Sequence, residues 1–143
     1  MLTRLELRHS QWETMRAHVQ ACAPMEGCGL LAGIGETVRE VLLITNSERA
    51  TKRFRMDPTE QLRAFASMDE RGLDLLGIFH SHPADARPGS PPAHQPSATD
   101  VREAAYPVVH LIWWRVRGQW HAKGYWIEND TFSEVPLQIA ADQ

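Results

Sequence analysis

The segment from Leu75 to Asp100, LLGIFHSHPADARPGSPPAHQPSATD, constrains the fold more than any other part of the chain. Its apolar start, Leu75–Phe79, predicts a buried strand that carries His80 and His82 at its C-terminal end. Side chains alternate between the two faces of a strand, so residues two apart point the same way. Both imidazoles can therefore reach one point in space, which is the geometry of a metal site.

A third ligand is expected from the far end of the loop that follows. The Pro83–Pro96 loop is rich in proline, and it leads to Ser97 in a helix N-cap position, with Asp100 in the first turn. The Asp100 carboxylate could turn back toward the two imidazoles. Two neutral imidazoles and one carboxylate suit Zn²⁺, and three protein ligands leave the fourth position of a tetrahedral site to water. Bound zinc can lower the pKa of that water toward ~7, so such a site can supply a hydroxide nucleophile.

Glu26 is the candidate proton acceptor beside such a water. It precedes a short apolar run, Gly27–Gly33, which is bounded by glycines and predicts a strand. The glycines formally match a relaxed dinucleotide-binding fingerprint, but that motif should follow a strand and open a helix. This run follows a predicted helix and opens a strand. We therefore interpret its small residues as allowing close backbone packing at a crowded site.

Taken in order, these residues resemble the signature of the JAMM (JAB1/MPN+) zinc metallopeptidases. The resemblance rests on Glu26, on the sequence His80-Ser81-His82-Pro83, and on the sequence Pro96-Ser97-Ala98-Thr99-Asp100. The flanking segments EGCGLLAG and GIFHSHP have the order of the small stand-alone prokaryotic JAB-domain branch, so the resemblance covers most of the chain. It implies a cytidine-deaminase-like α/β fold, the JAB/MPN fold, in which a mixed β-sheet is flanked by helices.

The resemblance also implies a role for each residue of the signature. His80, His82 and Asp100 become the zinc ligands. Glu26 becomes the general acid/base, and Ser97 becomes the group that stabilises the developing oxyanion.

The chain departs from the family in one place, the segment between the second histidine and the aspartate. Residues 83–96 form a Pro-rich insertion, several residues longer than the family's usual connection. Asp85 and His94 lie in this insertion and remain open as alternative ligands, although only Asp100 has the Pro-Ser-x-x-Asp context.

The function implied by the resemblance is that of a zinc-dependent peptidase or isopeptidase. Its substrate would be a ubiquitin-like or sulfur-carrier (ThiS- or MoaD-like) protein, hydrolysed after the C-terminal Gly-Gly, either to mature the carrier or to release a newly made cysteine. Two other functions stay open. A catalytically inactive MPN-type interaction scaffold would be expected to lose ligands, and all are kept here. A zinc deaminase-like hydrolase needs an H-x-E or C-x-E with a P-C-x-x-C, and the chain has neither.

Length, charge and cysteine content exclude several classes of protein. A chain of 143 residues fits one domain, residues 1–143, without disulfides. The net charge of −3 and the lack of a basic cluster argue against nucleic-acid binding. No apolar run predicts a signal peptide or a membrane span, so a cytoplasmic protein is expected. Cys22 and Cys28 are expected to be reduced and packed. No feature predicts an oligomeric state.

The rest of the chain predicts alternating strands and helices. A capping box at Ser10 and Glu13 predicts a helix that runs to about Ala23. Trp113 and Trp114 are adjacent on a predicted strand and must face opposite ways, so one is expected in the core and the other is either a substrate contact or an edge residue. The other predicted elements are strands at Thr3–Arg8 and Arg39–Thr45, a last short strand or tail contact at Phe132–Leu137, helices at Asp57–Gly72 and Ser97–Ala105, and a hairpin of Val108–Trp114 and Gln119–Ile127.

Overall fold

The computed structural model describes residues 1–48, 54–84, 93–104 and 106–142. The strands are β1 (Leu5–Arg8), β2 (Cys28–Ile34), β3 (Thr37–Ile44), β4 (Asp74–His82), β5 (Val109–Val116), β6 (Gln119–Glu128), β7 (Thr131–Val135) and β8 (Leu137–Ala140). The helices are α1 (His9–Cys22), α2 (Pro58–Glu70) and α3 (Ala98–Glu103). In this part of the chain the strands form one sheet in the order β7-β6-β5-β4-β2-β3-β1-β8, with both parallel and antiparallel neighbours.

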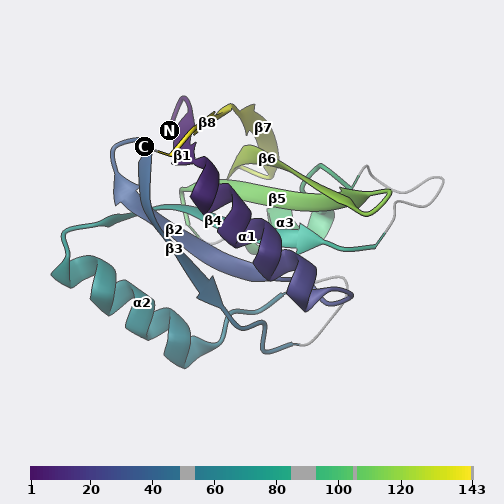
Figure 1. Cartoon of the computed structure of the whole chain (residues 1–143), viewed down its shortest axis with the longest axis horizontal. Coiled ribbons are helices and arrows are strands. Elements are labelled where there is room, and N and C mark those ends of the chain that lie inside the picture. Colours follow the sequence, from purple (N-terminus) through teal and green to yellow (C-terminus); the bar gives the residue numbers. More distant parts are fainter. Residues whose placement is uncertain (49–53, 85–92, 105, 143) are drawn as a thin grey trace.

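The two faces of the sheet are covered by different helices. Because residues alternate along a strand, Ile78 and Phe79 of β4 belong to opposite hydrophobic clusters. Phe79 belongs to the cluster that includes Met15 and Val19 of α1, whereas Ile78 belongs to the cluster that includes Met68 of α2. Figure 1 shows β2 and β3 running between α1 and α2. The predicted architecture, a mixed sheet flanked by helices, is confirmed.

The centre of the sheet is packed closely around β2 and β4. These strands are antiparallel neighbours, and a Cβ added to Gly29 of β2 would lie 2.3 Å from Phe79 Cε1. Only glycine fits at that position, which confirms the interpretation of the small residues as close packing. A strand rather than a helix follows Gly27, so the match to a dinucleotide-binding motif has no structural basis.

The two ends of the sheet meet at Pro136. β7 lies at one edge of the sheet and β8 at the other, yet only Pro136 separates them in sequence. The Pro136 carbonyl accepts a hydrogen bond of 3.0 Å from the backbone N–H of Leu5, where β8 begins to pair with β1. The sheet must curl for this to occur, and Figure 1 shows β7 and β8 close together. The predicted last strand, Phe132–Leu137, is therefore two strands on different edges.

The first helix begins earlier than the predicted capping box. Its N-cap is Arg8, whose backbone N–H donates to Gln11 Oε1 at 2.8 Å. The Ser10 prediction is wrong because β1 pairs with β8 as far as Arg8 and the chain enters the helix directly from the strand. Asp142, beyond β8, then accepts a hydrogen bond of 2.8 Å from the Ser10 N–H. A contact with a distant segment thus replaces the local cap.

Two other predicted elements are confirmed, the helix at Asp57–Gly72 and the hairpin of Val108–Trp114 and Gln119–Ile127. Asp57 caps α2 and accepts a hydrogen bond of 2.9 Å from the Glu60 N–H, while Gly72 follows that helix with a φ of 66°. The β5–β6 hairpin turns at Arg117 and Gly118, which have φ values of 50° and 78°.

Several predictions fall outside the described residues. Most of the Pro83–Pro96 insertion, including Asp85, lies there, and so does Ala105 at the end of the third predicted helix. Among the residues that the structure describes, no helix is long and apolar enough to cross a membrane.

Candidate metal centre

Three polar atoms converge where β4 ends. Both His80 and His82 lie on β4, two residues apart, so they share one face of the sheet. His80 Nε2 lies 3.2 Å from both His82 Nε2 and Asp100 Oδ2, and His82 Nε2 lies 3.0 Å from the same oxygen. The side chains of His80 and Asp100 are 1% and 7% exposed. The three predicted ligands therefore form a compact, buried triangle.

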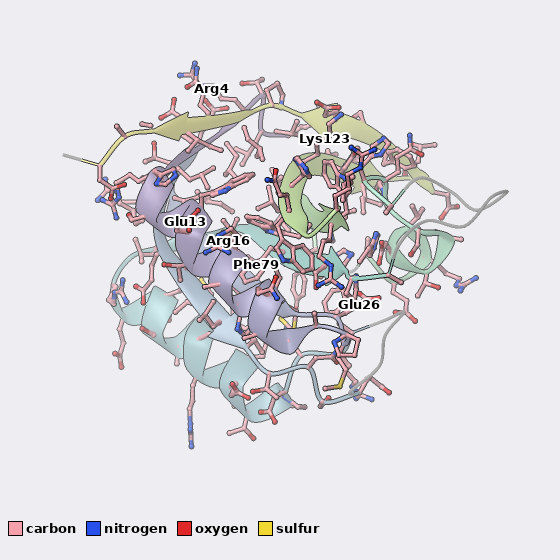
Figure 2. The ribbon with its side chains drawn as sticks, turned by 45° about the vertical axis from the view of Figure 1, so that its right-hand side comes forward. Arg4, Glu13, Arg16, Glu26, Phe79 and Lys123 are labelled. Atoms are coloured by element: carbon pink, nitrogen blue, oxygen red, sulfur yellow. The ribbon has the colours of Figure 1, made fainter. Side chains whose placement is uncertain are left out.

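Glu26 reaches the same point from the loop before β2. One atom each from Glu26, His80 and His82 lies within 4.8 Å of the others, so this cluster could hold a metal ion. Glu26 is 2% exposed, and its Oε1 has no hydrogen-bond partner among the described residues. A buried carboxylate oxygen without a partner is costly, so this atom is suited to a group that the protein does not itself supply. Figure 2 shows Glu26 beside the C-terminal end of α1.

Hydrogen bonds to the backbone of Glu26 and Gly27 hold Glu26 beside β4. The Gly27 N–H donates to Ser81 Oγ at 2.8 Å, and the Ser81 N–H donates to the Gly27 carbonyl at 3.0 Å. On the other side, Asn46 Nδ2 donates to the Glu26 carbonyl at 3.0 Å. Ser81 points away from the face of the two histidines, which is why it can bond to the neighbouring segment. The HSH sequence therefore supplies both the imidazoles and the support for Glu26.

Asp100 is held by its own helix terminus. Ser97 is the N-cap of α3, where its Oγ accepts from the Asp100 N–H at 3.0 Å. In return, the Ser97 N–H donates to Asp100 Oδ2 at 2.8 Å. This reciprocal pair is the predicted capping arrangement, and it aims the carboxylate at the two histidines.

The backbone carbonyl of Ala93 orients the imidazole ring of His82. His82 Nδ1 lies 2.9 Å from the Ala93 carbonyl oxygen. A carbonyl can only accept, so Nδ1 carries the proton and, in the neutral ring, Nε2 keeps its lone pair. That lone pair is on the atom closest to Asp100. By contrast, His80 Nδ1 is buried and has no hydrogen-bond partner in the described part of the chain.

The charges of the cluster perturb one another strongly. Burial raises the pKa of Glu26 to about 8; the His82 ring opposes this rise and Asp100 adds to it. Burial would also raise the pKa of Asp100, but His80 and His82 hold it well below its usual range. For His82, burial lowers the pKa, yet the hydrogen bond and the charge of Asp100 outweigh burial and leave it raised. Without a metal, His82 and Asp100 therefore favour an ion pair.

A cavity of about 330 Å³ opens from His80 and Asp100 and extends between α2 and α3. Phe54 lines it and stacks on the His80 ring, with centroids 4.6 Å apart and an interplanar angle of 22°. His110, from β5, also lines the cavity; it is 5% exposed, and burial lowers its pKa to about 4. Sequence reasoning did not place His110 beside the site, because its position depends on the β4–β5 register, in which it pairs with Ile78.

The structure thus brings Glu26, His80, His82, Ser97 and Asp100 together. Of the two alternative ligands, Asp85 lies outside the described residues. The His94 ring packs against Trp114, with centroids 5.5 Å apart. Sequence reasoning assigned no task to Asn46 or Ala93. Asn46 carries no motif, and Ala93 acts through its carbonyl, which every residue has.

The two cysteines differ in burial: Cys28 is packed as expected, whereas Cys22 is half-buried. Both Cys22 and Cys28 are free thiols. Cys28 is buried, its Sγ donates to the Ile44 carbonyl at 3.5 Å, and burial raises its pKa to about 12.

Comparison with known sequences places the site in a family context. The sequence model of a protein family, described as prokaryotic homologues of the JAB domain, matches residues 9–127. A "Probable TtuB-protein conjugate cleaving protease" of Thermus thermophilus is 37% identical over 100 residues, which cover 70% of this chain and 63% of that protein, less than two thirds of its length. A "CysO-cysteine peptidase" of Mycobacterium tuberculosis is 30% identical over 139 residues, covering 94% of this chain and 90% of the relative.

Solved structures have the same fold. The solution structure of a protein from Desulfitobacterium hafniense has a TM-score of 0.80 and 33% identity, covering 96% of this chain and 94% of the other. A JAB1/MPN domain protein from Archaeoglobus fulgidus, at 19% identity, has a TM-score of 0.55 with coverages of 95% and 98%, and supports the fold alone. The predicted JAB/MPN fold is thereby confirmed, and with the family match over residues 9–127 the chain belongs to the prokaryotic JAB-domain family.

Proposed function

We propose that this protein is a single-domain zinc peptidase that hydrolyses the bond after the C-terminal Gly-Gly of a small ubiquitin-like or sulfur-carrier protein. The observation that carries the proposal is the convergence of His80 Nε2, His82 Nε2 and Asp100 Oδ2, with the buried, partnerless oxygen of Glu26 beside them. The relatives named as a CysO-cysteine peptidase and a probable TtuB-protein conjugate cleaving protease support the substrate class.

The donor set fits zinc. A tetrahedral zinc ion with nitrogen and oxygen ligands at about 2.0–2.1 Å separates its ligand atoms by about 3.3 Å. The three atoms here are separated by 3.0, 3.2 and 3.2 Å, so only a small expansion is required. In this proposal His80, His82 and Asp100 hold the metal, which when bound supplies a Lewis acid for the scissile carbonyl and lowers the pKa of water.

Glu26 is proposed as the proton carrier. The carboxylate accepts a proton from the attacking water and delivers it to the leaving amine, as general acid/base catalysis requires. In the metal-free protein burial raises the pKa of Glu26, so the carboxyl is in an environment that lets it hold a proton between the two transfers.

Ser97 is proposed to donate a hydrogen bond to the developing oxyanion. Its Oγ accepts from the Asp100 N–H, which leaves the hydroxyl proton free to donate toward the substrate.

The surroundings of the cluster support an extended, glycine-rich substrate tail. His80 and Asp100 are almost fully buried, so a chain that brings its carbonyl to them has little room for side chains next to the scissile bond. The cavity lined by Phe54, Met56 and Tyr106 begins at this point and offers space for the tail residues that precede the two glycines.

The test is intact-mass analysis of a sulfur-carrier protein extended by several residues past its Gly-Gly. It is incubated with zinc-loaded wild-type protein, with Glu26→Gln, and with Glu13→Gln as a matched control on the exposed face of α1. We expect a product ending at Gly-Gly with the wild type and with Glu13→Gln only. A carrier that ends in Ala-Ala before the extension should not be cut. An uncut Gly-Gly carrier in the presence of one bound zinc per chain would refute the proposed substrate class, and a chain that binds no zinc would favour the scaffold function.

A further inference from the structure

The insertion between His82 and the Ser97 cap is attached to β5 at both of its described ends. At the first end, Arg115 Nη2 donates to the Pro83 carbonyl at 3.4 Å. At the second end, the His94 ring lies 5.5 Å from the Trp114 ring, centroid to centroid. Trp114 and Arg115 are consecutive residues of β5. One short stretch of that strand therefore contacts both ends of the insertion.

Trp114 lies next to His82 in the sheet. The β4–β5 register pairs His82 with Trp114, and the β5–β6 register pairs Trp114 with His121. Paired residues of neighbouring strands point to the same face, so these three side chains form a row across β4, β5 and β6. The Trp114 and His121 rings are stacked, with centroids 5.4 Å apart and an interplanar angle of 26°. Trp113, by contrast, is fully buried on the other face and packs against Trp12.

The end of the insertion lies against this row. Ala93 bonds to His82 through its carbonyl, and the next residue, His94, packs on Trp114. Because the two residues are adjacent, fixing the His94 ring also restricts where the Ala93 carbonyl can lie. A ligand histidine is normally oriented by an acceptor on its second ring nitrogen, and loss of such a partner typically costs about 10- to 100-fold in metal affinity.

We propose that Trp114 is a positioning residue of the metal centre: through the packed His94 ring it holds the Ala93 carbonyl that orients His82. This inference rests on the proposed metal site, and it also gives His94 a supporting role in place of a ligand role.

The test measures metal binding without substrate, on the full chain. Zinc affinity is obtained by competition with a chromophoric chelator, and the cobalt-loaded protein is examined by visible absorption, which reports the geometry of the ligands. The variants are Trp114→Ala and His94→Ala, each with an aromatic replacement, Trp114→Phe and His94→Phe. Val116→Ala is the matched control, since Val116 is an exposed residue on the same face of the same strand.

We expect Trp114→Ala and His94→Ala to lower zinc affinity by about 10-fold and to change the cobalt spectrum. The phenylalanine variants should bind zinc within about two-fold of the wild type, because they keep a ring at the contact. Val116→Ala should match the wild type. A ligand role for His94 predicts the opposite for His94→Phe, which would then lose zinc together with His94→Ala.

Wild-type affinity and an unchanged cobalt spectrum in His94→Ala would overturn the inference. His94 lies outside the strands and helices, so this variant remains informative even if Trp114→Ala fails to fold. That result, with a wild type that binds zinc and cleaves its carrier, would leave the proposed function intact. A wild type that binds no zinc would overturn both.

Discussion

The candidate metal centre has two halves that are fixed by different means. The sheet half consists of Glu26 and His80, which are held by the β2–β4 ladder, by the Ser81–Gly27 hydrogen bonds and by the core. The loop half consists of His82, Ser97 and Asp100, whose orientations depend on the Ala93 carbonyl and on the cap of α3. The sheet half therefore inherits its geometry from many cooperative bonds, whereas the loop half depends on a few. Four predictions follow from this contrast.

The largest effect is expected in the sheet half, from Glu26→Gln. The substitution keeps the shape of the side chain but removes the proton acceptor, so kcat/KM should fall about 1000-fold. Zinc content should stay at the wild-type value, because the proposed ligands are untouched. Cleavage followed by mass spectrometry, together with metal analysis, measures both quantities. A turnover near that of the wild type would contradict the proposed role of Glu26.

Removing one ligand from each half compares the halves directly. His80→Ala and Asp100→Ala should each lower zinc affinity by more than about 100-fold, beyond the loss typical of a supporting residue. The metal-free proteins should differ, however. His80→Ala leaves a gap beneath Phe54 in a fully buried position of the sheet and should lower the melting temperature more than Asp100→Ala. The Asp100→Ala change removes the ion pair with His82 and half of the α3 cap but leaves the sheet intact. Chelator competition and thermal melting test these expectations. Equal melting temperatures would mean that the two halves are equally rigid.

The pH dependence of metal-free stability isolates the burial of Glu26. Its pKa is about 8 in the folded protein and 4.5 as the reference value. Between pH 4.5 and about pH 8, the Glu26 carboxyl is therefore protonated in the folded state and ionised in the unfolded state. Stability falls as the pH rises through this range. Glu26→Gln removes this titration, so the variant should exceed the wild type in unfolding free energy by about 4 kcal/mol at pH 8 and by only about 1 kcal/mol at pH 5. Denaturant unfolding at both pH values measures the difference. A constant offset between the two proteins would contradict a buried, titrating Glu26.

The smallest effect on stability is expected from Ser97→Ala in the loop half. Loss of the cap should cost about 1 kcal/mol, confined to α3. Hydrogen exchange of the Val101 amide, which bonds to the Ser97 carbonyl in that helix, should quicken. Ser10→Ala is the matched control, because the structure places the N-cap of α1 at Arg8 instead. Equal losses from the two serine substitutions would show that Ser97 has no special capping role.

Local sequence patterns predicted most of the elements. Alternation along a strand predicted that His80 and His82 would face the same way, and the Ser97–Asp100 spacing predicted the cap of α3. The same reasoning failed at Ser10, where a contact with Asp142 replaced the local cap. Asn129 and Asp130, with φ values of 52° and 61°, form a second tight turn. Asn and Asp favour such turns, so this turn could have been predicted from the sequence.

By itself, the sequence indicated the residues of the candidate site and predicted their local directions, because strand alternation and helix capping act over two to four residues. Only the tertiary structure decided what lies next to them. The approach of Gly27 to Ser81, of Ala93 to His82 and of Pro136 to Leu5 joins segments that are distant in the chain. In each of these contacts at least one partner is an ordinary backbone group, so the residue type does not indicate the contact. Their partners are selected when the sheet curls and buries its two apolar faces.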